Sequence, residues 1–314
     1  MRFFLRLIES YVFVLFAALV FGLALPSVAI KLAPYSTIIL GIIFFLSALK
    51  IDLKELRRDA ADWKMLVVVN LWMLVVLPVI VFMLAKLVVP EYAFAFMILA
   101  AMPAGMTSPL LSDIVGGRQS LALILTLSTS LLAPFTIPLM IKLIGGAAIS
   151  VSFLSMFWTL GQVIFIPFLL AALVKRAFHA HVKAATYAFK PASIVLLGLL
   201  IAGVVAKQAD VIAHGFTLEF LKLIVALFVL FGVFHVLGYF TVYWHDRRDR
   251  LTITVCTTYM NFTLAIYLVG IYFNVPSITV PVVLSVLPWS LFMLPFKQTV
   301  GGLLKARRLR SKRG

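Results

Sequence analysis

The stretch MPAGMTSP, residues 102–109, interrupts an apolar run that extends over residues 92–115. Pro103 and Pro109 lack a backbone donor, and Gly105 has no Cβ to hold a helical geometry. A helix cannot run smoothly through this stretch, and backbone groups freed in hydrocarbon are costly unless they are hydrogen-bonded. Broken backbone at membrane depth usually lines a protein-enclosed cavity, so the stretch predicts a binding site. The alternative is a proline kink that only shapes helix packing.

A second interruption lies close to half a chain further on. The stretch CTTYMNFT, residues 256–263, places polar side chains in the middle of the apolar run 251–273. Met260 follows Gly105 by nearly half of the 314 residues. Corresponding interruptions in two halves of a chain indicate a duplicated fold with a site between the halves.

The composition predicts an all-α polytopic membrane protein. Hydrophobic residues make up 64% of the chain and charged residues 12%, whereas soluble domains carry about 25% charged residues. The apolar residues form long runs, most of them with the ~20 residues that cross ~30 Å of hydrocarbon. We predict ten spans, with approximate bounds 11–29, 36–51, 65–89, 92–115, 119–144, 153–175, 187–206, 218–243, 251–273 and 276–304. The first is interpreted as a retained span, with a signal peptide as the alternative.

The basic residues set the expected orientation. Lys31, Lys142 and Lys207 are the only ones between spans on one side of the membrane. The other side holds Arg2, Arg6, Lys54, Arg57, Arg58, Lys64, Arg118, Lys175, Arg176, Lys183, Arg247, Arg248, Arg250 and six in the tail 305–314. By the positive-inside rule both termini are cytoplasmic, and we expect a bacterial inner membrane. The net charge of +16 therefore indicates no nucleic-acid partner. The basic tail predicts contact with anionic membrane lipid, with a regulatory or partner site as the alternative.

The chain shows no pattern of an enzyme. It contains no phosphate-binding glycine loop and no His/Cys cluster at metal-ligand spacing, so we expect no cofactor and no metal. All eleven acidic residues fall in loops or near span ends. A proton relay or a tight sodium site in a membrane usually recruits a buried carboxylate, and none is predicted at mid-membrane.

Several short segments of this chain resemble the bile acid:sodium symporter family. They are residues 39–46 and 51–56 near the start, PAGMTS at 103–108 followed by Gly116-Gly117, and NFTLA at 261–265. The resemblance implies a single membrane transporter domain with ten helices in two inverted five-helix repeats, about 1–147 and 148–304. It further implies a panel of spans 1, 2, 6 and 7, and a core of spans 3–5 and 8–10 in which spans 4 and 9 are broken crossing helices.

The departures from that family concern sodium. Sodium-coupled members carry a Ser-Asn pair at the first break, and here Ser108 is followed by Pro109. Thr126 matches a hydroxyl ligand on the next helix, while Ala122 replaces a second one. Cys256 stands where those members carry a Glu that serves both sodium sites. Sodium is a candidate coupling ion, but the residues leave the coupling ion open. The resemblance implies the transport fold more strongly than it implies sodium coupling.

The candidate site residues are polar side chains at or near the two breaks. The predicted substrate-binding set is Asn70, Thr107, Ser108, Ser112, Thr258, Asn261 and Thr263. The predicted ion-binding set is Ser108, Thr126, Thr257 and Thr258. Hydrogen bonds within a helix or between helices are the alternative for each of them. His235, the only histidine well inside a span, is expected to bond to a neighbouring helix and not to form a proton path.

Together these patterns predict a secondary active transporter. It would move a small organic anion across the membrane by alternating access around the two breaks. A non-transporting membrane receptor or scaffold with the same fold is the alternative. The residues leave the substrate, the direction of transport and the oligomeric state open.

Overall fold

The computed structural model describes residues 11–50, 62–146, 151–213, 217–273, 275–293 and 295–299. In these ranges the chain is helical, and the only β pairing is one isolated bridge. The basic tail 305–314 and the arginines before residue 11 lie outside the described residues.

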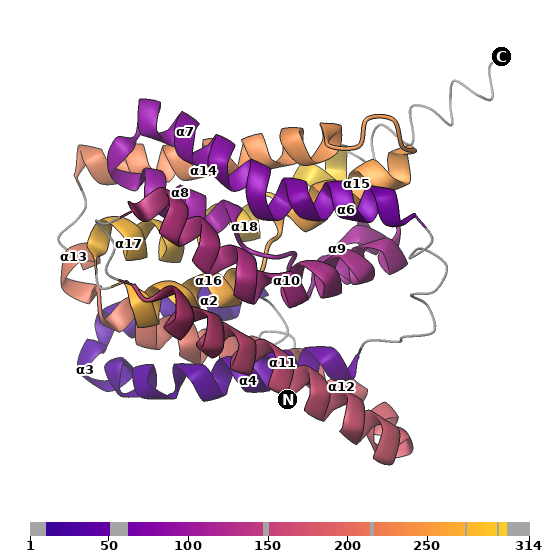
Figure 1. Ribbon diagram of the computed structural model, residues 1–314. Coiled ribbons are helices and arrows are strands. Elements are labelled where there is room, and N and C mark those ends of the chain that lie inside the picture. Colours follow the sequence, from indigo (N-terminus) through magenta and orange to yellow (C-terminus); the bar gives the residue numbers. More distant parts are fainter. Residues whose placement is uncertain are drawn as a thin grey trace.

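Figure 1 shows the arrangement of the helices. In chain order they are α2 Tyr11–Ala24, α3 Pro26–Ala29, η1 Ile30–Tyr35, α4 Ser36–Leu49, α6 Trp63–Leu71, η2 Trp72–Val76, α7 Leu77–Val88, η3 Pro90–Tyr92, α8 Ala93–Ala100, α9 Ser108–Ile114, α10 Gln119–Gly145, α11 Phe153–Ala177, α12 His179–Ala206, α13 Ala209–Ala213, α14 Leu218–Phe240, α15 Arg247–Thr258, α16 Phe262–Tyr272, α17 Pro276–Leu284 and α18 Val286–Leu291.

Seven helical stretches of the described chain are long and apolar enough to cross a membrane. Three shorter apolar helices, Phe13–Ala24, Pro90–Ala100 and Phe262–Tyr272, account for other parts of the predicted spans. The prediction of a helical membrane protein is therefore confirmed. The count of ten spans and their inverted repeat remain predictions.

Three predicted boundaries differ from those of the structure. The predicted first span 11–29 ends at Ala24, and Pro26 begins a new helix. Proline is well suited to the first position of a helix, because its missing N–H has no partner there in any case. The helices from Pro26 to Leu49 then form one stretch of 24 residues, longer than the predicted span 36–51. Similarly, α12 begins at His179 and not at residue 187.

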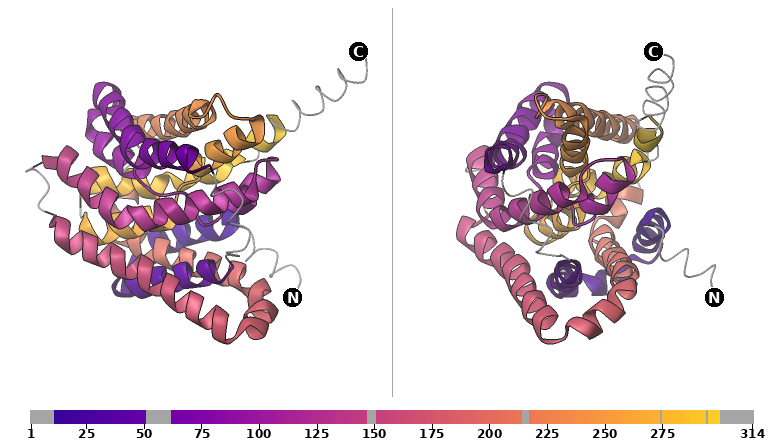
Figure 2. Two further views of the ribbon diagram at one scale, coloured as in Figure 1. Left: turned by 45° about the vertical axis from the view of Figure 1, so that its right-hand side comes forward. Right: turned by 90° about the vertical axis from the view of Figure 1, so that its right-hand side faces the viewer.

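The helices fall into two groups in space. Helices α2, α4, α11 and α12 pack on one another in the lower part of Figure 1, and Figure 2 shows the same grouping from two other directions. The remaining long helices, with α8, α9, α15 and α16, lie above them. The groups meet where α11 packs on α10 and where α12 packs on α16.

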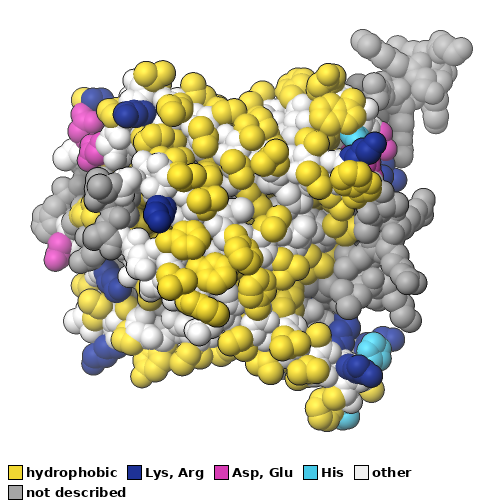
Figure 3. All heavy atoms as spheres, viewed as in Figure 1, with side chains coloured by type: hydrophobic (Ala, Val, Ile, Leu, Met, Phe, Trp, Pro, Cys, Tyr) yellow, Lys and Arg dark blue, Asp and Glu magenta, His cyan; other side chains and the backbone are white. Residues whose placement is uncertain are grey.

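The outer surface is that of a membrane-embedded molecule. Charged side chains gather near the left and right edges of Figure 3, and apolar side chains cover the surface between them. Exposed apolar residues such as Leu169 on α11 and Val225 on α14 belong to this surface. The membrane normal therefore runs from left to right in Figures 1 and 3, along the long helices.

Candidate functional site

The two interrupted helices meet at their breaks. Helix α8 ends at Ala100 and α9 begins at Ser108, while α15 ends at Thr258 and α16 begins at Phe262. Between these ends, Ala104 and Met260 form the isolated antiparallel bridge. We call residues 101–107 and 259–261 together the crossing.

Each break satisfies the backbone of the other. The Gly105 N–H donates to the Tyr259 carbonyl at 3.1 Å, and the Asn261 N–H donates to the Pro103 carbonyl at 2.7 Å. In the hydrocarbon core, backbone groups that leave a helix must find hydrogen-bond partners within the protein, and these bonds supply them. The sequence-based expectation that the breaks near Gly105 and Met260 lie together is therefore confirmed.

Glycine is required at the centre of the crossing. A Cβ on Gly105 would overlap the Tyr259 carbonyl oxygen and would lie 3.0 Å from that of Met260. Those contacts are with backbone, which cannot turn aside as a flexible side chain does. The second break is fixed by Asn261, whose Oδ1 accepts from the Leu264 N–H at 3.0 Å and so caps α16.

A small cavity with both polar and apolar lining residues lies on one face of the crossing, between the two groups of helices. It has a volume of about 70 Å³, and we call it the central cavity. Its polar lining from the crossing and from α16 consists of Thr107, Asn261 and Thr263, three of the predicted substrate-binding residues. Ser47 and Lys50 line it from the end of α4, and Ser193 lines it from α12.

The electrostatics of the central cavity favour an anion. Lys50 lines it, and the charge of Lys190 on α12 is close enough to repel that of Lys50. No acidic residue of the described chain lines this cavity. In addition, the Asn261 Nδ2 is buried and has no hydrogen-bond partner in the described part of the chain. The cavity therefore presents positive charge to whatever enters it, and Asn261 beside it has an amide donor without a partner in the described part of the chain.

The opposite face of the crossing is buried and rich in hydroxyls. The Ser108 hydroxyl donates to the Tyr259 carbonyl at 3.3 Å, and the Thr126 hydroxyl donates to the Gly105 carbonyl at 3.2 Å. The Ala104 N–H donates to the Thr129 hydroxyl at 3.1 Å. Cys256 is fully buried here and its thiol interacts with Ser108. We call this side the hydroxyl face.

The predicted ion-binding residues are divided between two surroundings. Ser108 and Thr126 lie on the hydroxyl face, where α10 packs against the crossing. Thr257 instead packs against Gly238 of α14. The hydroxyls of Thr257 and Thr258 are buried and have no hydrogen-bond partner in the described ranges. Such groups cost about 1–3 kcal/mol when left unsatisfied, so both retain an oxygen for a water or a cation.

Four of the seven predicted substrate-binding residues do not line the central cavity. Ser108 and Thr258 are described above, and the other two are Ser112 and Asn70. Ser112 donates to the Thr252 hydroxyl at 3.1 Å and so joins α9 to α15. Asn70 donates from Nδ2 to the Leu66 carbonyl at 2.7 Å and to the Ser128 hydroxyl at 3.0 Å, which joins α6 to α10. Both side chains therefore make the helix contacts that were the alternative reading of these positions.

The contact between α9 and α15 continues to the membrane edge. The Arg118 N–H donates to the Thr252 hydroxyl at 2.7 Å, and the Arg118 guanidinium lies 2.8 Å from the buried Asp249 carboxylate. Since Asp249 is only 4% exposed, its charge needs this cation. Asp249 is thus engaged in an ion pair and is not available to the crossing.

Sequence reasoning missed some residues that line the central cavity, notably Lys50, Ser193 and Trp289. The signal for Lys50 was a charge at the very end of a span, which is equally typical of a lysine that reaches to the lipid headgroups. His235 behaves as expected, since Nδ1 donates to the Phe231 carbonyl at 2.8 Å and Nε2 lies 3.3 Å from the Tyr259 hydroxyl. Among the described residues no group of His, Cys, Asp and Glu is placed to hold a metal ion.

Comparison with known proteins agrees with this geometry. Residues 37–215 match the Sodium Bile acid symporter family. The chain is 29% identical over 196 residues to the uncharacterized sodium-dependent transporter YocS of Bacillus subtilis, covering 61% of this chain and 60% of that protein. It is 23% identical over 285 residues to sodium/bile acid cotransporter 7 of Danio rerio, covering 85% of this chain and 84% of that protein.

A plant relative extends the comparison. The probable chloroplastic sodium/metabolite cotransporter BASS1 of Oryza sativa subsp. japonica is 24% identical over 218 residues, covering 67% of this chain and 52% of that protein. The chain thus spans less than two thirds of the length of the Bacillus and rice relatives. The family match covers more than half of the chain, and the apolar helices cross the membrane several times. The chain therefore belongs to the sodium bile acid symporter family, which consists of membrane transporters and not of enzymes.

Proposed function

We propose that this protein is a secondary active transporter that moves a small organic anion across the membrane by alternating access. The observation that carries the proposal is the central cavity, which joins the crossing to α4 and α12 and contains a lysine but no acidic side chain of the described chain. Family membership favours transport over the alternative of a receptor or scaffold.

The cavity is too small to hold an organic substrate in the conformation described. A volume of about 70 Å³ corresponds to only a few water molecules at ~30 Å³ each. Binding therefore requires the two groups of helices to move apart. We assign α2, α4, α11 and α12 as the panel and the other long helices as the core, with the central cavity at their boundary. The core would rock against the panel around the crossing, as in other transporters with broken helices.

The residues of the cavity have separate roles in this proposal. Lys50 attracts and neutralises the anionic group of the substrate. Asn261 and Thr107 donate hydrogen bonds to its oxygens, since the Asn261 Nδ2 has no other partner among the described residues. Because both sit at the crossing, they move with the core, whereas Lys50 moves with the panel. An anion held between Lys50 and the crossing would therefore change the side of the membrane that it faces when the core rocks against the panel.

We further propose that transport depends weakly or not at all on sodium. The oxygens on the hydroxyl face are neutral, and Cys256 supplies no charge there. A cation in a dry site needs a compensating negative charge, and the nearby Asp249 is engaged with Arg118. This departs from the relatives, whose names describe sodium-dependent transporters.

Uptake into sealed proteoliposomes tests both parts. Purified protein is reconstituted, a panel of radiolabelled monocarboxylates, dicarboxylates and sulfonates is offered, and uptake is measured with sodium or with choline as the cation. We expect saturable uptake of at least one anion in both salts. Binding without uptake would instead establish the receptor, and uptake that requires sodium would overturn the second proposal.

A further inference from the structure

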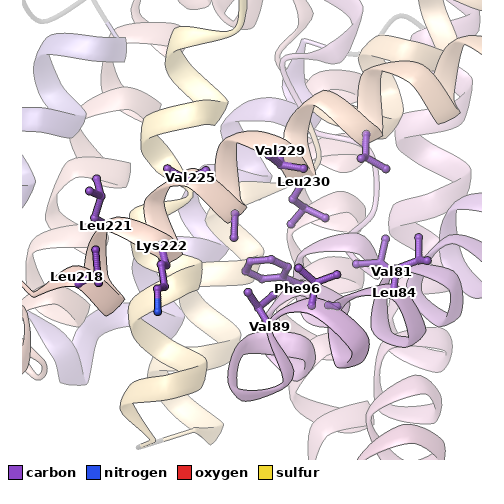
Figure 4. A pocket seen from close by; sticks show the side chains of 14 residues that line it. Val81, Leu84, Val89, Phe96, Leu218, Leu221, Lys222, Val225, Val229 and Leu230 are labelled. Carbon is purple, nitrogen blue, oxygen red and sulfur yellow. The ribbon is translucent and has the colours of Figure 1, made fainter.

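A long groove opens to the membrane on the side of the molecule away from the panel. It lies between α7 and α14 and has a volume of about 560 Å³ (Figure 4). Its floor is made of buried side chains, Val81 of α7, Phe96 of α8 and Leu230 of α14. Its walls are exposed, and they include Leu84 and Val229. We call it the side groove.

The dimensions of the side groove suit a single hydrocarbon chain. Its lining on α14 runs from Leu218 to Val233. At ~1.5 Å per residue this is roughly 22 Å along the helix, which exceeds one leaflet of a ~30 Å hydrocarbon core. The groove thus extends along the membrane normal for about the length of an acyl chain.

An empty groove of this size is unfavourable. Its floor of close-packed side chains would face a void and lose the dispersion contacts that a neighbour provides. No described segment of the protein enters the groove. Because the walls of the groove are exposed apolar side chains such as Leu84 and Val229, the neighbour at hand is the hydrocarbon of the membrane.

One end of the groove is charged. Lys222, on the second turn of α14, is the only charged residue among the described ones that lines it. Its Nζ lies 2.7 Å from the Glu219 carboxylate, and both side chains are more than half exposed. The two charges together are neutral, and they sit at the edge of the apolar surface, at the depth of lipid headgroups.

We propose that the side groove binds one acyl chain of a zwitterionic phospholipid, with the lipid phosphate at Lys222 and its ammonium at Glu219. A headgroup with both charges satisfies both members of the pair and leaves no charge uncompensated. An anionic headgroup would satisfy Lys222 but would face the Glu219 carboxylate, which repels it. The bound chain packs on Phe96, and so braces α8, the helix that leads into the crossing.

Native mass spectrometry of lipid adducts tests this proposal. The full-length protein is reconstituted into vesicles of equal parts phosphatidylethanolamine and phosphatidylglycerol, then extracted into detergent and analysed. We expect wild-type protein to retain one phosphatidylethanolamine in preference to phosphatidylglycerol. Retention of detergent alone, or equal retention of the two lipids, would overturn the proposal.

Matched variants locate the lipid. Ala226→Phe places a ring in the groove, since Ala226 lines it, and we expect the adduct to be lost. Ala172→Phe, at an exposed alanine on α11, adds the same ring to the apolar surface elsewhere and should leave the adduct in place. Equal adducts in these two variants would contradict the groove as the site.

A milder variant covers the case in which Ala226→Phe does not fold. Lys222→Gln keeps the groove intact, and we expect it to retain a lipid while losing the preference for phosphatidylethanolamine. Added phosphatidylethanolamine should also raise the melting temperature of the wild-type protein more than that of Lys222→Gln, because a ligand stabilises the state that binds it. An unchanged lipid preference in Lys222→Gln would contradict the proposed contact between Lys222 and the lipid headgroup.

Discussion

The two faces of the crossing share one backbone and differ in chemistry. On the side of the panel, Thr107 and Asn261 border a cavity that also contains Lys50. On the side of α10, the hydroxyls of Ser108 and Thr126 donate hydrogen bonds to backbone carbonyls of the crossing itself. The first face keeps free polar atoms for a ligand, and the second uses its polar atoms to hold the break together. In the proposed mechanism, the same pair of broken helices serves recognition on one side and structure on the other.

Adding a methyl group at Gly105 should disrupt both faces at once. A Cβ there would overlap the Tyr259 carbonyl, so Gly105→Ala forces the breaks apart and removes the hydrogen bonds between them. We expect a loss of about 3 kcal/mol or more in stability and no transport, measured by thermal melting and proteoliposome uptake. Gly232→Ala on α14 is the control, since a Cβ at Gly232 meets nothing within 4 Å. Equal melting temperatures of these two variants would contradict the packing of the crossing.

A carboxylate on the hydroxyl face should make transport respond to sodium. Cys256→Glu supplies the negative charge that the Ser108 and Thr126 hydroxyls lack. We expect sodium to stimulate uptake by the variant, measured at increasing sodium with a constant total salt concentration. Cys256→Gln has the same size without the charge and should remain insensitive. Steep, saturable activation of the wild-type protein by sodium would show that neutral oxygens suffice on this face.

Removing the positive charge from the other face should weaken substrate binding. A charge contact near a wet surface is worth about 1 kcal/mol, which corresponds to roughly a fivefold change in affinity. We therefore expect Lys50→Gln to raise the KM for an organic anion about fivefold, and Lys50→Arg to raise it less. Lys31→Gln removes an exposed lysine outside the cavity and should leave the KM unchanged. An unaltered KM in Lys50→Gln would exclude Lys50 from substrate binding.

The smallest effects should separate a helix contact from a cavity residue. Ser112→Ala removes the bond to Thr252, so we expect a loss of about 1 kcal/mol in stability with the KM unchanged. Thr107→Ala should raise the KM and leave the stability unchanged, because Thr107 lines the cavity and makes no side-chain cap bond to α9. Melting temperature and KM are measured for both variants. A change of KM in Ser112→Ala would show that Ser112 contributes to substrate binding and is not only a helix contact.

Backbone chemistry explains what the sequence predicted well. Pro103 and Gly105 forbid a continuous helix whatever surrounds them, and the hydrocarbon obliges the freed groups to find partners. That reasoning located the first break, whereas the polar cluster at 256–263, nearly half a chain further on, located the second. The polar side chains were harder, because a hydroxyl at a break has the same sequence signature whether it faces a cavity or a neighbouring carbonyl. Ser112 and Asn70 turn to Thr252 and Ser128, and only the packing of the helices decides this.

The same limit explains the residues that were missed. Lys50 and Ser193 line the central cavity from helices far from either break in the sequence. Their place depends on how α4 and α12 lie against the crossing, which no local pattern encodes. The side groove has no sequence signal either. Apolar residues of α7 and α14 line it, and they are of the same kind as those on the rest of these helices.

The hydrogen bonds of the crossing also set the order in which the newly made chain is completed. Tyr259, which accepts bonds from both Gly105 and Ser108, follows Ser108 by 151 residues. At ~5–20 residues per second, a ribosome needs roughly 8–30 s to make the intervening chain. Throughout that delay the first break waits with its amide and carbonyl groups unsatisfied. The N-terminal half therefore cannot complete its hydrogen bonds alone. During this interval a chaperone, or water drawn into the bilayer, must supply hydrogen-bond partners to the backbone of residues 101–107.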